Sequence, residues 1–159
     1  MAGEVVRAAS GKHTRRTQLE AVRQVSLAAL IMLVVQYGLG IILNLYMPVP
    51  ASDAHAGLPQ EIGNGPAMLT LHAVLGLALI GAALVLLVRA VRLEDRLIAV
   101  LAAAGLTVIG GAFASGEIFV RNGQPGASLA MALLTGVALL CYIGALTWVS
   151  AALRRRGPG

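Results

Sequence analysis

The sequence predicts an all-α integral membrane protein: a four-helix up-down-up-down transmembrane bundle with both termini cytoplasmic. Three observations lead to this fold class: the composition, four long apolar runs, and the placement of Lys and Arg. Of the 159 residues, 58% are hydrophobic and only 12% are charged, whereas a soluble domain carries about 25% charged residues. The chain therefore lacks the polar surface of a soluble protein.

The four apolar runs occupy residues 25–47, 67–88, 97–120 and 128–153. Each run exceeds the roughly 20 residues that a helix needs to cross the hydrocarbon core. The runs are continuously apolar instead of alternating, which excludes membrane-spanning strands. The first run is longer than the apolar region of a signal peptide, which has roughly 7 to 15 residues, and it follows a polar segment. We therefore expect it to be a permanent span.

This pattern divides the chain into a basic cytoplasmic segment (1–24), a transmembrane domain (25–153) and a basic cytoplasmic tail (154–159). The second and third runs are joined by Leu93, Glu94 and Asp95, and the last two by the turn sequence Asn-Gly-Gln-Pro-Gly at residues 122–126. Because short connections make consecutive helices antiparallel neighbours, an up-down-up-down order follows.

The basic residues predict the orientation of the spans. All twelve Lys and Arg residues except Arg121 lie before the first run, between the second and third, or after the fourth. The positive-inside rule places those segments in the cytoplasm. We expect a multi-pass protein of the inner (plasma) membrane. The basic tails carry no nucleic-acid recognition motif, so the expected partner is the lipid bilayer and not a nucleic acid.

Small residues predict where the helices touch, because helices in lipid associate through close packing. Two sets recur at spacings of four residues, which places each set on one helix face. We expect these two faces to meet: Ala103, Thr107, Gly111 and Ser115 on the third run, and Ser128, Ala132 and Gly136 on the fourth.

Polar groups inside spans are candidates for function because they are costly in lipid. Those of this chain converge on the outer leaflet, and they are Gln36, Tyr37, Asn44, His72, Ser115 and Glu117 with the thioether of Met131. Several have structural explanations as well. Glu117 and Arg121 are spaced i, i+4 and could form a surface ion pair. Tyr37 and Asn44 could serve as an interfacial anchor and an interhelical hydrogen bond.

His72 is the only histidine within a span. A neutral imidazole is a ligand for haem iron or a hydrogen-bond donor to a quinone. A histidine that hydrogen-bonds a neighbouring Asn or Gln satisfies the physics equally well. Under either interpretation we expect the side chain to point into the bundle, near Asn44 or Tyr37. The cofactor hypothesis makes Met131, Asn44 and Tyr37 secondary contacts, and makes His72 a metal ligand only if b-type haem is bound.

The sequence shows no motif for a disulfide, a metal site or a known catalytic mechanism. The single cysteine, Cys141, has no partner for a disulfide, and His13 and His55 form no metal-ligand spacing. No nucleophile elbow, phosphate loop or paired carboxylates are present. The sequence favours a non-enzymatic protein, although it leaves enzymatic activity open.

Three segments carry a resemblance: "NLYMPVP" at residues 44–50, "LHAVLG" at 71–76 and "SLAMAL" at 128–133. The chain resembles an uncharacterised actinobacterial family of small four-span membrane proteins, which implies the same architecture and no activity. More distantly, "LHAVLG" after a Gly-rich outer loop is similar to one four-helix half of haem A synthase and other b-type cytochromes. That likeness implies haem between the second and fourth helices, with His72 as one ligand and Met131 in the place of the second histidine.

Three functions remain in view. The first is an accessory or structural subunit of a larger membrane complex, which packs on other membrane subunits. The second is a haem- or quinone-binding redox protein that uses His72. The third is a homo-oligomeric channel or transporter lined by Gln36, Tyr37 and Asn44, for which more intramembrane charge is normally expected.

Overall fold

The computed structural model describes residues 2–46 and 67–155, with side chains described from residue 14 onward. These residues form four helices: α1 (Ala2–Tyr46), α3 (Ala67–Arg92), α4 (Arg96–Asn122) and α5 (Pro125–Arg155). No strand occurs within the described ranges. Each helix contains a segment long and apolar enough to cross a membrane, which in α1 is Thr14–Tyr46. These four candidate spans indicate a multi-pass membrane protein.

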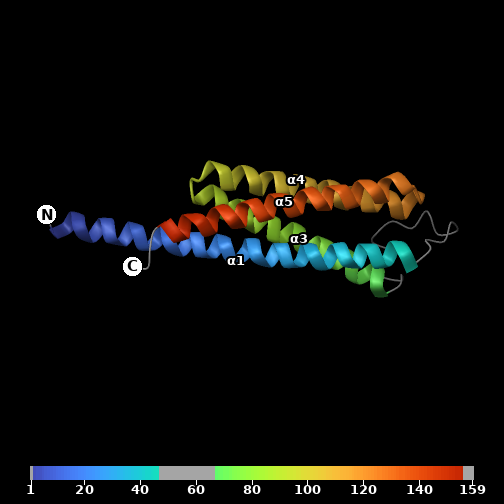
Figure 1. The fold of residues 1–159 in the computed structure, drawn as a ribbon, viewed down its shortest axis with the longest axis horizontal. Coiled ribbons are helices and arrows are strands. Elements are labelled where there is room, and N and C mark those ends of the chain that lie inside the picture. The colour runs from blue at the N-terminus through green and yellow to red at the C-terminus, as the bar shows by residue number, and fades with distance from the viewer. Residues whose placement is uncertain (1, 47–66, 156–159) are drawn as a thin grey trace.

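The four helices form one antiparallel bundle, in which each contacts the next along the chain and α5 returns to α1 (Figure 1). The contact between α4 and α5 is the most extensive. The expected up-down-up-down order of helices is therefore present. In α1 the helix runs through the boundary expected at residue 24, and its N-terminal part projects beyond the other three helices.

Local chemistry explains the two short connections. Asp95 caps the N-terminus of α4, where its carboxylate accepts a hydrogen bond from the Ile98 backbone N–H at 3.3 Å. At the other end of α4, Gly123 adopts the left-handed conformation (φ 63°), and its N–H donates to the Phe119 carbonyl. Pro125 then begins α5, where a helix has no need of its missing N–H.

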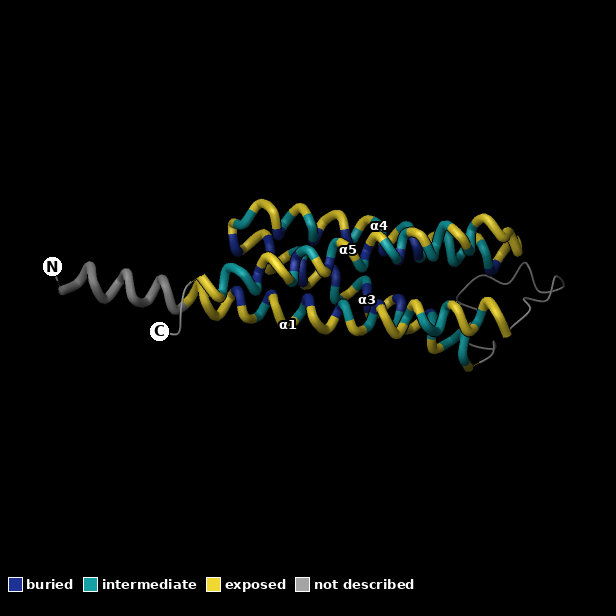
Figure 2. Tube along the Cα trace, viewed as in Figure 1, coloured by how far each residue is buried: buried dark blue, intermediate teal, exposed yellow. Residues whose placement is uncertain are grey.

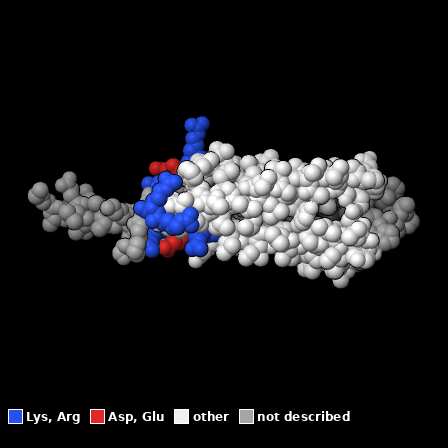
Figure 3. Space-filling model, viewed as in Figure 1, with Lys and Arg blue, Asp and Glu red and all other residues white. Residues whose placement is uncertain are grey.

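The bundle has two unlike halves. We call the end at the α3–α4 turn the basic end, because charged side chains gather there on the face shown in Figure 3. The opposite end is the loop end. The basic half comprises α1 up to Leu33, α3 from Leu79, α4 up to Ile109 and α5 from Ala138, and the loop half is the remainder.

Most of the buried side chains lie in the basic half (Figure 2). One cluster there joins all four helices and includes Leu33, Leu86, Ile98, Tyr142 and Val149. In the loop half the buried apolar cluster consists of Ala73 and Val120, with Phe113 packed against them. The bundle is therefore tightest near its basic end.

The expected small-residue contact between α4 and α5 is present only in part. Ala103 and Thr107 are exposed on the outside of α4, whereas Gly111 does contact Leu134 of α5. The buried face of α4 is instead formed by Ile98, Ala102, Gly105, Ile109 and Ala112. On α5 the buried residues are Thr135, Ala138, Tyr142, Ala145 and Val149, while Ser128, Ala132 and Gly136 are half-buried.

The close approach of Tyr142 to Gly105 explains which face of α4 is buried. A Cβ atom on Gly105 would lie only 2.7 Å from Cε2 of the Tyr142 ring. Only glycine leaves room for the ring at this position. The pairing of the largest buried side chain with a glycine turns both helices away from the faces that spacing alone suggested.

Candidate functional site

His72 lies on α3 in the loop half and turns its imidazole toward α1. Its Cε1 atom is 3.4 Å from the position that a Cβ on Gly40 would occupy. The expectation that His72 points toward the first span is therefore confirmed. Its contact on α1 is at Gly40, which lies between Tyr37 and Asn44 in the sequence. Gly40 leaves space for the imidazole between the two helices.

Gln36 bridges the same two helices one turn away. Its Nε2 atom donates a hydrogen bond to the His72 backbone carbonyl at 2.9 Å. The same nitrogen is 3.3 Å from the Cβ position of Gly76, so a glycine on α3 makes room for the amide. The sequence placed Gln36 in a polar strip but not in the site itself. Its position one turn before Gly40 is the signal that could have found it.

The pairing between Gln36 and His72 is incomplete. Among the described residues, neither His72 Nδ1 nor Gln36 Oε1 has a hydrogen-bond partner, and both atoms are buried. A buried polar atom without a partner costs about 1 to 3 kcal/mol. Gln36 is therefore bonded to the backbone of His72, and the expected hydrogen bond between an Asn or Gln and the imidazole is not present at Nδ1.

Asn44 and Tyr37 are not part of this arrangement. Ser128 Oγ donates to Asn44 Oδ1 at 3.2 Å, which joins the loop ends of α1 and α5. The interhelical hydrogen bond suggested for Asn44 is therefore present. Tyr37 is 40% exposed and faces the outside of the bundle.

Met131 faces α4. Its sulfur lies 3.3 Å from the Cβ position of Gly116. A haem between His72 and Met131 requires open space beside Gly76, but Gln36 and Phe113 occupy that space, with Phe113 Cδ2 at 3.6 Å from the Cβ position. The residues around His72 do not offer the open face that a porphyrin needs, so they do not fit this cofactor.

Glu117 and Arg121 in the loop half form a surface ion pair. Arg121 Nε donates to Glu117 Oε1 one turn earlier on α4, and the Arg121 side chain is mostly exposed. This is the i, i+4 ion pair that the spacing suggested. Within residues 2–46 and 67–155, no group of three or more His, Cys, Asp and Glu residues is placed to hold a metal ion.

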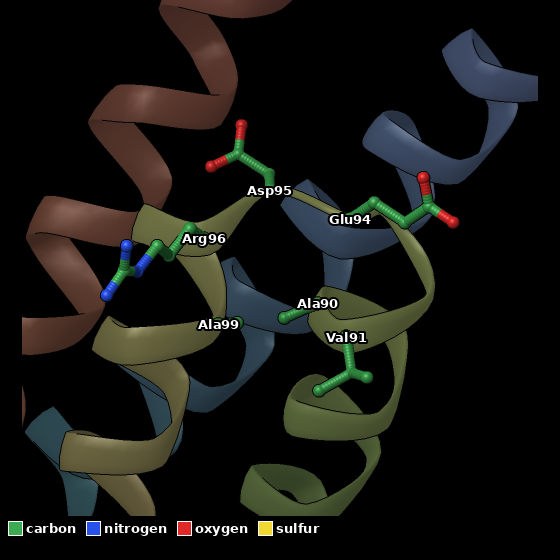
Figure 4. Close-up of a pocket in the computed structure, with 6 residues that line it drawn as sticks. All are labelled: Ala90, Val91, Glu94, Asp95, Arg96 and Ala99. Atoms are coloured by element: carbon green, nitrogen blue, oxygen red, sulfur yellow. The ribbon is translucent and has the colours of Figure 1, made fainter.

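A cavity of about 230 Å³ lies at the basic end, beside the α3–α4 turn. Figure 4 shows the side chains of Glu94, Asp95 and Arg96 pointing apart at its rim, while Ala90 and Ala99 lie between the helices. Asp95 also accepts a hydrogen bond from Trp148 Nε1 at 3.4 Å, and the Arg155 guanidinium lies 5.9 Å from the centre of the Trp148 ring. These contacts tie α5 to the turn, and they bring no acid and base together.

The fold is a four-helix bundle whose four candidate spans indicate a multi-pass membrane protein, with polar contacts between α1 and α3 in its loop half. No family model, curated protein or solved structure matches the chain.

Proposed function

We propose that this protein is a non-enzymatic accessory or structural subunit of a larger membrane complex, and that it packs against a transmembrane helix of a partner subunit through the outer face of α4. The observation that carries the proposal is a run of small exposed residues along the middle of that face. Ala103, Thr107, Gly110 and Ala114 are all exposed. Their spacings of four, three and four place them on one side of the helix.

The other three helices present different surfaces. Large exposed side chains cover them, including Leu133 and Leu140 on α5, which are 62% and 70% exposed. On α4 the large exposed hydrophobic residues are Leu97, Val100 and Ile118, near the two ends of the helix. A Cβ on Gly110 would meet nothing within 4 Å in this chain.

Lipid tails solvate apolar helices well, so the shape of a face decides whether helices associate. A face of small residues lets a second backbone approach closely and adds dispersion contacts that flexible lipid chains supply less well. A partner helix therefore gains more from the outer face of α4 than from the faces of α1, α3 and α5.

We further propose that the bundle lies in the plasma membrane with both termini and the α3–α4 turn in the cytoplasm. The gathering of Arg side chains at the basic end supports this orientation (Figure 3). Cysteines placed at Ser52 and Asn122 should react with an impermeant reagent added outside intact cells, and cysteines at Ser10 and Arg156 should not. The reverse pattern of labelling would overturn the orientation.

The partner contact is tested by photo-crosslinking in native membranes. A photoreactive side chain at Ala103 should yield one crosslinked product of defined mass, and Gly110→Leu should remove it. The same photoreactive group at Gly81 is the control, because Gly81 is an exposed glycine of α3 with nothing within 4 Å of its Cβ position. Equal crosslinking from both sites contradicts the proposal. A product with twice the mass of the chain would mean that the partner is a second copy of this protein.

A further inference from the structure

Among the described residues, two buried polar atoms of the side chains that join α1 and α3 have no hydrogen-bond partner: Nδ1 of His72 and Oε1 of Gln36. Both belong to side chains at the contact between α1 and α3. The Gln36 amide nitrogen is bound to the His72 backbone carbonyl, and the His72 ring lies against Gly40, one helical turn along α1 from Gln36. Two glycines, Gly40 and Gly76, provide the space in which these side chains lie.

The hydrogen bonds that Gln36 and His72 can still make define the kind of ligand that would fit them. Because Nε2 of Gln36 already donates to the His72 carbonyl, the free atom of the amide is Oε1, which can only accept. The imidazole can donate from Nδ1 when the proton of the neutral ring is on that nitrogen. A hydroxyl group answers both needs, since its O–H donates and its oxygen accepts.

We propose that Gln36 and His72 form a binding site for one hydroxyl group, which donates to Gln36 Oε1 and accepts from His72 Nδ1–H. The hydroxyl belongs to a bound water or to a lipid-soluble phenol of the hydroquinone type. Both sources present the same donor and acceptor to the two side chains. The site lies on α1 and α3, so it does not depend on the partner contact proposed for α4.

The position of the site favours an exchangeable ligand. His72 and Gln36 are half-buried, and they lie in the loop half, where the apolar cluster is small. Within the described part of the chain, two other buried hydroxyls have no partner, those of Ser26 and Tyr142, and both lie in the basic half and are at most 1% exposed. Among the described residues, the pair between α1 and α3 is the one whose unpaired atoms belong to half-buried side chains outside the large cluster.

Nitrogen-15 NMR of the full chain in nanodiscs, with labelled histidine, tests the site directly. The His72 signals are assigned by comparison with His13→Gln and His55→Gln. We expect Nδ1 of His72 to be protonated and hydrogen-bonded, and Gln36→Met to shift its resonance. The matched control is Tyr37→Phe, the neighbouring residue on the exposed face, which should leave the resonance unchanged.

Two ligand arms identify the source of the hydroxyl. Tetramethylhydroquinone is added to one sample and its dimethyl ether, which has no hydroxyl donor, to the other. A shift of the His72 Nδ1 resonance with the hydroquinone alone identifies a lipid-soluble phenol, and Gln36→Met should then weaken binding about tenfold. No shift with either compound, together with magnetisation transfer from water to the Nδ1 proton, identifies bound water.

Three results overturn the proposal: an unprotonated Nδ1, a resonance that Gln36→Met leaves in place, or a Nδ1–H that receives no transfer from either water or the hydroquinone. Because Gln36→Met also removes the hydrogen bond to the His72 carbonyl, the variant could fail to fold. If the variant does not fold, the proposal is tested on the wild-type protein, by the protonation state of His72 Nδ1 and by the magnetisation transfer.

Discussion

The basic half and the loop half of the bundle are built from the same kinds of helix, yet they are held together differently. In the basic half, side chains from all four helices meet in one cluster, with Leu33, Leu86 and Tyr142 almost fully buried. In the loop half the apolar cluster is small, and polar contacts join the helices: Gln36 to His72 between α1 and α3, and Asn44 to Ser128 between α1 and α5.

The difference between the halves corresponds to two different requirements, close packing and ligand binding. Close packing needs small and large side chains that fit each other, and it excludes ligands. A binding site needs polar groups with spare hydrogen-bonding capacity, which weaken packing in an apolar bundle. We therefore expect the basic half to contribute most of the stability. The loop half contains His72 and Gln36, the half-buried side chains whose polar atoms lack partners among the described residues.

The largest expected effect comes from Gly105→Leu in the basic half. The new side chain must displace the Tyr142 ring, and we expect a loss of about 3 kcal/mol or more in the free energy of unfolding. Gly111→Leu should cost less, because it meets the flexible end of Leu134. Gly110→Leu, on the open face of α4, should cost almost nothing. Reversible unfolding in mixed micelles measures all three, and a different order would mean that α4 is rotated in the bundle.

A matched pair of leucines compares the two halves directly. Leu33 is 1% exposed in the large cluster, whereas Leu134 is a half-buried residue of the loop half. Leu33→Ala should lower the free energy of unfolding by about 2 kcal/mol, because the cavity forfeits packing contacts, and Leu134→Ala should lower it by less. Equal losses in the same unfolding assay would remove the distinction between the halves.

Removing buried polar groups should have different effects on stability in the two halves. Tyr142→Phe removes a buried hydroxyl that has no partner among the described residues, so we expect it to stabilise the bundle by about 1 kcal/mol. His72→Leu should bring no such gain in nanodiscs, since its ring nitrogen holds the proposed hydroxyl. A gain of equal size from His72→Leu, measured by thermal unfolding, would count against the binding site.

The smallest effect should come from the hydrogen bond at the loop end. Ser128→Ala removes the donor to Asn44, and interhelical hydrogen bonds in membrane proteins contribute about 0.6 kcal/mol on average. We expect a loss of that order in the free energy of unfolding, without any change in the His72 Nδ1 resonance. A loss as large as that of Leu33→Ala would show that polar contacts, and not the large cluster, hold the bundle together.

The sequence by itself determined the features that depend on local composition. Four apolar runs of spanning length, the short connection at Leu93, Glu94 and Asp95, and the Asn-Gly-Gln-Pro-Gly turn at residues 122–126 were all readable, because helix length and turn chemistry are local properties. The i, i+4 pair of Glu117 and Arg121 was readable for the same reason.

Only the tertiary structure decided which side of each helix faces inward. Hydropathy varies little around these helices, and α4 offers small residues on nearly every side, so spacing alone could not choose between Gly105 and its neighbours. The choice was made by the fit of Tyr142 against Gly105 across two helices. The partner of His72 was decided in the same way, because Gln36 reaches it only where Gly40 and Gly76 bring α1 and α3 close together.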